Sequence, residues 1–256
     1  MQNLQYFLAA LFAPLLLPIL YWQGKRIRSR VPKLPPAKGP RGKAGAGEQP
    51  HFQLITMGES TIAGLGVSTH EEGFSGTLAM HLADQLKQPV KWQVLARSGY
   101  TAADVRKHLV PKLPSDAPDL IVIGLGGNNA FGLYPPWLWR RHIRQLIRDL
   151  RKRYADTPIV FTDMPPVRSF PAFTPLMQFL IGNLVEMLGR TLAKEVARHP
   201  GVYYYDHVIT FEDWSKRLGV SGQAADFFSD GVHPSRLTYQ VWARDIAGFL
   251  TDRVPL

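Results

Sequence analysis

The chain of 256 residues contains no cysteine. Disulfide bonds and thiolate metal sites are therefore excluded, and cysteine usage says nothing about the redox compartment. The sequence also lacks a Walker loop, a G-x-S-x-G nucleophile motif and a histidine spacing typical of metal sites. Gly124-Leu125-Gly126 begins like a dinucleotide-binding loop, but Gly127-Asn128-Asn129 follows it and the third glycine is missing. We therefore expect neither a metal nor an organic cofactor.

Acidic residues are scarce in the first fifty positions. Residues 1–50 contain eight Lys or Arg and one acid, Glu48, whereas the remaining residues contain 22 basic and 19 acidic side chains. Most of the formal charge of +10 therefore belongs to the N-terminal extension, and the rest of the chain carries only +3. Because a nucleic-acid footprint must lie on the folded surface, we expect no nucleic-acid partner.

Charged side chains are absent from residues 1–24. The stretch 4–22 is almost wholly apolar, and as a helix with a rise of about 1.5 Å per residue it would span roughly 28 Å. These features predict a transmembrane anchor over residues 1–24, with Tyr21 and Trp22 at the headgroup level. The alternative is a cleaved signal peptide. A signal peptide needs a positive n-region, a shorter apolar stretch and a small-residue cleavage site, and the sequence shows none of them clearly.

Basic residues follow the apolar stretch directly, at Lys25, Arg26, Arg28 and Arg30. By the positive-inside rule, the C-terminal side of the anchor lies in the cytoplasm, so we expect a membrane-anchored protein with a cytoplasmic domain. Residues 25–50 are rich in Pro, Gly and Lys and predict an extended, mobile linker. Either its charges touch anionic lipid headgroups or it is a solvated tether, and the sequence favours neither.

From residue 51 onward, short apolar runs alternate with amphipathic ones, which is typical of a parallel sheet covered by helices. The expected strands are residues 52–57, 90–96, 119–125, 158–163 and 202–206. The expected helices are residues 74–86, 102–109, 137–154, 176–198 and a last one after Pro234. Residues 51–256 thus predict one three-layer α/β domain with a doubly wound, five-stranded parallel sheet. A flavodoxin-like strand order fits, although the sequence alone does not fix it.

Four short motifs lie at ends of these expected elements. They are Gly58-Glu59-Ser60 after the first strand, Ser98-Gly99 after the second, Gly126-Gly127-Asn128 after the third, and Asp230-Gly231-Val232-His233 before the last helix. Ligands of such sheets bind outside the carboxyl ends of the strands, so we expect these residues to meet at one rim.

The order and spacing of the four motifs resemble the sequence blocks of the SGNH or GDSL family of esterases and lipases. The resemblance implies an SGNH hydrolase fold and cleavage of carboxylic esters through an acyl-enzyme. It implies that Ser60 is the nucleophile, that His233 is the base and that Asp230 orients the imidazole. It further implies an oxyanion hole made of the Ser60 and Gly99 backbone N–H groups and the Asn128 side-chain amide.

The resemblance covers about residues 52–250, and the stretch 164–173 also resembles a loop of bacterial members. Two residues depart from the family pattern. Glu59 replaces the aspartate of the usual GDS, and we expect little loss because the negative charge is kept. Asn129 replaces the acid that usually follows the Asn, which removes a carboxylate beside the site without removing a triad member.

The sequence leaves the substrate open. An anchor favours lipid or lipid-derived esters by proximity, and Phe170 and Phe173 are candidates for an acyl-binding wall, although both would also fit an ordinary core. Deacetylation of a sugar or another small acyl ester is the alternative within the same fold. A catalytically silent, membrane-tethered binding module is the alternative outside enzymes. Taken singly, Ser60 could also be a helix cap, and Gly99 and Asn128 could be turn residues.

Overall fold

One mixed sheet forms the centre of the molecule. The computed structural model describes residues 16–27, 29–47, 51–207, 210, 212, 216 and 224–256. Within them, six strands are joined in the order β1-β3-β2-β4-β5-β6. The five parallel strands are β2 (Phe52–Gly58), β3 (Val90–Ala96), β4 (Leu120–Gly124), β5 (Ile159–Phe161) and β6 (Val202–Tyr204). Their order is that of a flavodoxin-like sheet, so the predicted fold class is confirmed.

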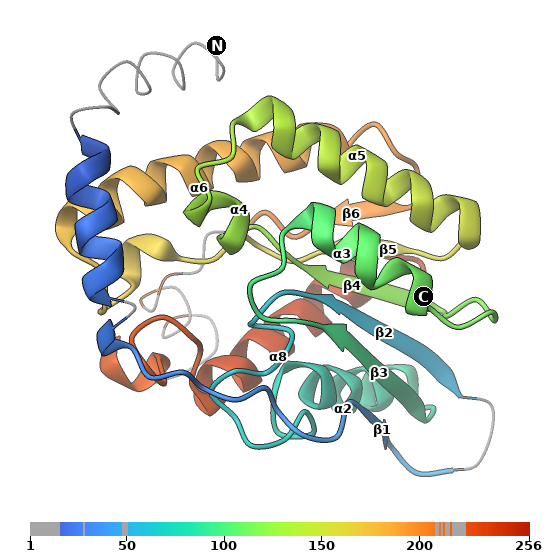
Figure 1. Cartoon of the computed structure of the whole chain (residues 1–256). Helices are drawn as coiled ribbons and strands as arrows, with labels where there is room; N and C mark the ends of the chain where they lie inside the picture. The colour runs from blue at the N-terminus through green and yellow to red at the C-terminus, as the bar shows by residue number, and fades with distance from the viewer. Residues whose placement is uncertain are drawn as a thin grey trace.

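Helices cover both faces of this sheet (Figure 1). One face packs against α2 (Phe74–Leu86) and α8 (Arg236–Arg253), which also contact each other. The other face packs against α3 (Ala102–His108), α5 (Pro136–Arg153) and α6 (Pro175–Val196). Every residue of β4 is buried, as expected for a central strand that is covered on both sides.

Local sequence signals set the starts of three helices beside the predicted motifs. The Thr101 side chain caps α3, and Asp104 returns the bond to complete a capping box. Thr174 caps α6 by accepting the Met177 backbone N–H, and Ser235 caps α8. Because these caps fix where each helix begins, they also fix the loops that precede the helices.

Two large buried side chains connect the helices to other parts of the core. The Trp139 indole on α5 donates to the Leu188 carbonyl of α6 at 3.1 Å. The Tyr239 hydroxyl on α8 donates to the Leu65 carbonyl at 2.8 Å. Both side chains are fully buried, so each bond satisfies a polar group that would otherwise lose its partner on folding. The Tyr239 bond joins α8 to the loop that follows Ser60.

The sheet has one strand more than the five that the sequence predicts. Strand β1 (Arg41–Ala44) pairs antiparallel with β3 at the edge of the sheet. It lies within residues 25–50, which were predicted to form a mobile linker, so residues 41–44 belong to the folded domain instead. A side chain at Gly42 would overlap with the Trp92 ring, so the strand backbone packs directly on this indole. Glycine permits that approach.

The predicted anchor falls only partly on described residues, because residues 1–15 lie outside them. Residues 16–27 form a helix, here called the N-terminal helix. In the described part of the chain, no helix has the length and apolar character needed to cross a bilayer. Gln23 connects this helix to the domain, since its Oε1 accepts a hydrogen bond from the Thr174 hydroxyl at 2.8 Å.

We expect Gly42→Val to lower the free energy of unfolding by about 1–3 kcal/mol, because the added methyl groups would displace the Trp92 ring from β1. Urea titration of the purified chain measures this change. Arg41→Val is the matched control, since Arg41 lies on the same strand with its side chain exposed. Equal losses in both variants would show that packing of β1 on Trp92 does not stabilise this edge.

Candidate active site

The Asp230–His233 turn brings a carboxylate and an imidazole into direct contact. His233 Nδ1 lies 2.7 Å from Asp230 Oδ2. The other carboxylate oxygen, Oδ1, accepts the backbone N–H groups of Val232 at 2.9 Å and His233 at 2.7 Å. Burial alone would raise the pKa of Asp230, but the hydrogen bonds from His233 and Val232 bring it below its ordinary value. Asp230 is therefore a carboxylate that fixes the orientation of the imidazole.

Gly231 allows this turn to pack against the loop that follows β5. Its φ of +83° lies in the region that favours glycine. A Cβ at this position would lie 2.9 Å from the Cβ of Ala172, so the two backbones are in close contact. The Ala172 N–H also donates to the Gly231 carbonyl at 3.1 Å. The stretch 164–173 thus supports the turn that bears His233.

Ser60 follows β2 directly, at the carboxyl end of the strand. The chain then forms a series of turns, and α2 does not begin until Phe74, so Ser60 is not the cap of that helix. Gly66 packs against the Pro234 carbonyl, and the Ser229 hydroxyl donates to the Gly66 carbonyl at 3.3 Å. The segment after Ser60 therefore lies against the Asp230–His233 turn. Among the described residues, the Ser60 hydroxyl makes no hydrogen bond to another side chain or to the backbone.

Two backbone donors beside Ser60 are unused. Among the described residues, the N–H groups of Ser60 and Gly99 donate to no acceptor. Gly99 has a φ of +85°, and no atom lies within 4 Å of the position that a Cβ would take. The predicted donors of Ser60 and Gly99 are thus available to a ligand, and the backbone at Gly99 borders open space.

Asn128 lies in the first turn of α4 (Gly127–Phe131), a short helix that the sequence did not predict. Its Nδ2 donates to Glu59 Oε2 at 2.6 Å and to the Tyr100 carbonyl at 3.2 Å. Glu59 precedes Ser60, and Tyr100 follows Gly99. The amide of Asn128 therefore lies between the first and second motifs.

Glu59 connects the first motif to the third. Its Oε1 accepts the Gly127 N–H at 2.7 Å, and its Oε2 accepts the Asn128 N–H at 2.9 Å in addition to the Asn128 side chain. Burial raises the pKa of Glu59 to about 7, against the effect of these three hydrogen bonds. The sequence interpretation gave Glu59 no part beyond its charge. Its three donors come from residues so distant in sequence that no local pattern indicated them.

Asn129 is fully buried and supports the loop that follows Gly99. Its Oδ1 accepts the Ala102 backbone N–H at 3.1 Å, at the start of α3. Its Nδ2 has no hydrogen-bond partner among the described residues. A buried donor without an acceptor typically costs about 1–3 kcal/mol, whereas a carboxylate at this position would have no such donor. The departure from the family pattern therefore leaves one polar atom unsatisfied.

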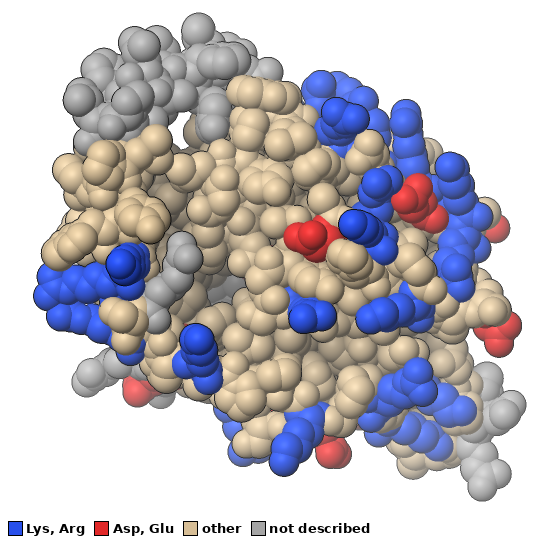
Figure 2. All heavy atoms as spheres, viewed as in Figure 1, with Lys and Arg blue, Asp and Glu red and all other residues tan. Residues whose placement is uncertain are grey.

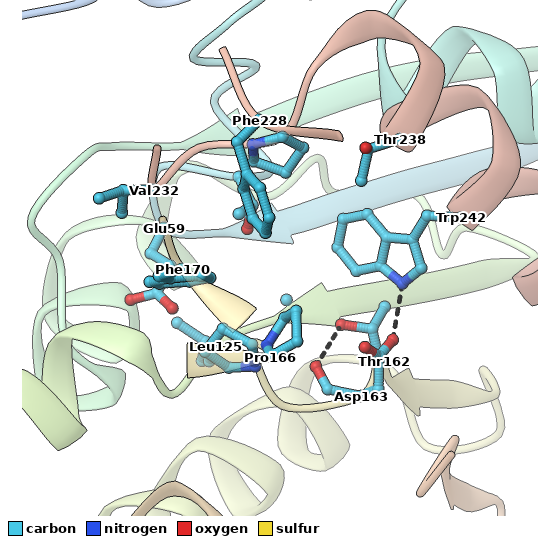
Figure 3. A pocket seen from close by; sticks show the side chains of 14 residues that line it. Glu59, Leu125, Thr162, Asp163, Pro166, Phe170, Phe228, Val232, Thr238 and Trp242 are labelled. Atoms are coloured by element: carbon cyan, nitrogen blue, oxygen red, sulfur yellow. Dashed lines mark hydrogen bonds between the residues drawn. The ribbon is translucent and has the colours of Figure 1, made fainter. Parts of the chain in front are cut away.

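An apolar cavity of about 60 Å³ is lined by Glu59 and Thr61, the residues on either side of Ser60 (Figure 3). The residues on either side of His233 also line it: Val232 and Pro234. The lining further includes larger apolar side chains: Leu125, Phe170, Phe228 and Trp242. Phe170, one of the two predicted wall residues, is part of the lining. Phe173 is not, but its ring contacts that of Phe170 with centroids 5.4 Å apart.

Asp163 lines this cavity beside Trp242 (Figure 3). Its Oδ1 accepts the Trp242 indole N–H at 2.6 Å. Burial raises the pKa of Asp163 to about 8. No group of three or more His, Asp or Glu side chains in the described part of the chain could bind a metal ion.

Comparisons with known proteins agree with this geometry. A family model described as the GDSL-like lipase/acylhydrolase family matches residues 56–241. Similar solved structures include a family 3 carbohydrate esterase of Clostridium thermocellum, at 15% identity and a TM-score of 0.58, with 79% of this chain and 96% of that chain covered. At 15% identity such a likeness shows the fold alone. None of the curated proteins matches the chain.

Two further solved structures show the same likeness. The lipase Lip_vut3 from a goat rumen metagenome has 18% identity and a TM-score of 0.59, with 77% of this chain and 98% of that chain covered. Phospholipase A1 from Streptomyces albidoflavus NA297 has 15% identity and a TM-score of 0.56, with the same shares covered, 77% and 98%. These values again support the fold and say nothing about the substrate of this chain.

We expect Glu59→Gln to remove a pH-dependent loss of stability. Because the pKa of Glu59 rises from 4.5 to about 7 on folding, the folded protein binds this proton more tightly than the unfolded chain. The contribution to stability is complete below pH 4.5 and is lost as the pH rises to about 7. The free energy of unfolding of the wild type minus that of the variant should therefore fall over this interval by about 3 kcal/mol.

Urea titrations across this pH range measure the difference. Asp163→Asn is the matched comparison, since burial raises the pKa of Asp163 to about 8. The free energy of unfolding of the wild type minus that of Asp163→Asn should therefore continue to fall up to that pH. A difference that does not change with pH for Glu59→Gln would show that the three donors keep Glu59 ionised despite its burial.

Proposed function

Because the chain belongs to the GDSL-like lipase/acylhydrolase family and is a carboxylic ester hydrolase, we propose that it cleaves esters through an acyl-enzyme on Ser60. The observation that carries this proposal is the Asp230–His233 pair. His233 Nδ1 lies 2.7 Å from Asp230 Oδ2, in a turn that packs against the segment after Ser60. In this assignment His233 is the general base and Asp230 orients it.

The reaction follows from the tautomer that Asp230 selects. With its Nδ1–H donated to Asp230, His233 has Nε2 as the basic atom. Nε2 takes the Ser60 proton as Oγ bonds to the ester carbonyl carbon, and then gives it to the alcohol as the C–O bond breaks. Water repeats the same steps on the acyl-enzyme, with His233 as base, and releases the carboxylic acid and free Ser60.

The unused donors support an oxyanion hole beside Ser60. The N–H groups of Ser60 and Gly99 have no acceptor among the described residues, so both are available to the negative oxygen of the tetrahedral intermediate. Asn128 Nδ2 is the third donor in this proposal. Because its two hydrogens face Glu59 and the Tyr100 carbonyl, one of them must be shared with the oxyanion during the reaction.

The apolar cavity is the proposed site of the acyl group. Its lining joins residues on both sides of Ser60 and His233, so an acyl chain bound there would begin close to the reacting carbonyl. A volume of about 60 Å³ accommodates a short chain or the first carbons of a longer one. Removal of acetyl or other short acyl groups from a sugar is therefore a second candidate, and lipid-derived esters remain the first because of the N-terminal apolar segment.

We also propose that residues 1–24 anchor the protein in a membrane, with residues 51–256 on the cytoplasmic side. The support is the uncharged apolar stretch, followed by Lys25, Arg26, Arg28 and Arg30. Digestion of the domain by protease in intact cells or spheroplasts, where only the outer side is accessible, would contradict the cytoplasmic orientation.

We expect Ser60→Ala to lower kcat/KM on aryl esters by at least about 1,000-fold, because the nucleophile is lost. A fluorophosphonate probe should label the wild type and fail to label this variant. Ser68→Ala is the control, since Ser68 is exposed in the turns between Ser60 and α2. Retained activity in Ser60→Ala would contradict the assigned nucleophile. A folded wild type without probe labelling would instead favour a catalytically silent binding module.

We expect Phe170→Leu to shift the preference toward longer acyl chains, because the smaller side chain enlarges the cavity. The measurement compares kcat/KM for aryl acetate, butyrate, octanoate and decanoate. Phe249→Leu is the matched control, as Phe249 on α8 contacts the Tyr205 ring and does not line the cavity. An unchanged chain-length profile in Phe170→Leu would show that the acyl group binds elsewhere. Highest turnover on acetate in the wild type would favour the short-acyl candidate.

A further inference from the structure

Large apolar side chains are exposed on the elements around the active site. They lie on the N-terminal helix, on α4 and just after it, at the start of α5 and on α6. We call them the apolar rim: Tyr21, Trp22, Phe131, Leu133, Trp137 and Phe179. Tyr21 is 73% exposed, and Trp22 and Phe179 are 58% and 59% exposed. In Figure 1, the C-terminal ends of the parallel strands point toward the side where the N-terminal helix lies. The rim therefore borders the edge of the sheet that bears Ser60.

Two contacts join the rim to the loop that lines the cavity. The Gln23–Thr174 hydrogen bond attaches the N-terminal helix to the start of α6. The Phe131 ring contacts the Phe173 ring, with centroids 5.7 Å apart. Thr174 and Phe173 are neighbours in the chain, so the N-terminal helix and α4 both meet the same short segment.

A row of aromatic rings leads from this rim into the cavity. Phe131, which is 41% exposed, contacts Phe173, and Phe173 contacts the buried Phe170 at 5.4 Å. Phe170 in turn contacts Phe228 at 5.5 Å, and both of these rings line the cavity. An apolar chain that moved along these rings would pass from the surface to the side of Ser60 over apolar side chains.

Positive charge adjoins the rim. Lys25, Arg26, Arg28 and Arg30 follow Tyr21 and Trp22 in the sequence, and no acidic residue occurs before Glu48. The Arg26 guanidinium lies over the Trp22 ring, 5.3 Å from its centroid. Figure 2 shows uncharged side chains over the upper part of the N-terminal helix and basic side chains gathered at its lower end. Each Lys or Arg near an anionic lipid surface contributes about 1 kcal/mol to binding.

We propose that the apolar rim docks on a phospholipid bilayer that contains anionic lipids, so that the active-site mouth faces the lipid. Aromatic side chains such as Tyr21 and Trp22 suit the headgroup region, and the adjoining basic residues complement anionic headgroups. A second copy of the chain fits less well, because a symmetric contact through this face would bring the basic segments of two molecules together. Docking itself does not depend on catalysis, whereas passage of an acyl chain along the rings rests on the proposed ester hydrolysis.

The absence of cysteine makes this proposal directly testable, since one introduced thiol is a unique labelling site. Leu133→Cys and Phe179→Cys place a fluorophore on the rim, and Met80→Cys is the matched control. Met80 is 48% exposed on α2, which covers the opposite face of the sheet. The full chain is reconstituted in vesicles of phosphatidylcholine, with or without phosphatidylglycerol, and nitroxide-labelled lipids are the quencher.

We expect quenching at positions 133 and 179, stronger with phosphatidylglycerol present, and little at position 80. No quenching at the two rim positions, or equal quenching at all three, would overturn the proposal. Fluorescence that changes with protein concentration in the absence of added lipid would show that the face binds a second copy instead. None of these outcomes depends on whether the protein hydrolyses esters.

A kinetic comparison tests the acyl route separately. Phe179→Ser should lower hydrolysis of an ester embedded in vesicles by about tenfold, because burial of one aromatic side chain in lipid is lost. Its hydrolysis of a water-soluble short ester should stay within about twofold of the wild type, and Met80→Ser should change neither rate. Equal losses on both substrates would overturn the route through the rim. Absence of hydrolysis of both esters by the wild type would contradict the proposed function and leave the quenching result to decide docking.

Discussion

A single buried carboxylate joins parts of the site that the chain supplies from different strands. Glu59 accepts two backbone N–H groups and one side-chain amide, and all three donors come from Gly127 and Asn128. Glu59, which precedes Ser60, is thereby bonded to Asn128, the third donor of the proposed oxyanion hole. Without this carboxylate, the backbone N–H groups of Gly127 and Asn128 would lose their acceptors. These bonds help to fix the positions of Ser60 and Asn128 relative to each other.

Parallel strands make such a contact possible, because their carboxyl ends lie along one edge of the sheet. β2 and β4 are neighbours, so Glu59 needs only its side chain to reach the start of α4. The Asp230–His233 turn comes from a different element, and it is positioned by packing against Gly66 and Ala172. The site is thus assembled from one edge of the sheet and one supported turn. Packing and hydrogen bonds between loops, as much as regular structure, determine its geometry.

The sequence predicts the parallel strands and the long helices of this fold well. It does not predict the edge strand β1 or the contacts between distant loops. Strands such as β4 are uninterrupted apolar runs, so their positions follow from composition. Three of the four motifs follow β2, β3 and β4 as predicted, and the fourth precedes α8. β1 was missed because Arg41–Ala44 contains no β-branched or aromatic residue and depends on contact with Trp92. The bonds of Glu59 to residues 68 and 69 positions away could not be read from local patterns. Phe170 and Phe173 are both phenylalanines of the same loop, so the sequence could not show which of them lines the cavity. Only their packing shows that Phe170 lines it and Phe173 does not.

The short spacing of Asp230 and His233 has a consequence for how this protein can vary. Both partners of the 2.7 Å contact lie in one four-residue turn, whereas Ser60 is far away in the sequence. Changes of length in loops that do not contact this turn leave the Asp230–His233 contact intact, provided that the turn still packs against Gly66 and Ala172. The pair forms a local unit, so changes of chain length in the intervening surface loops can alter the surroundings of the cavity without changing the Asp230–His233 contact.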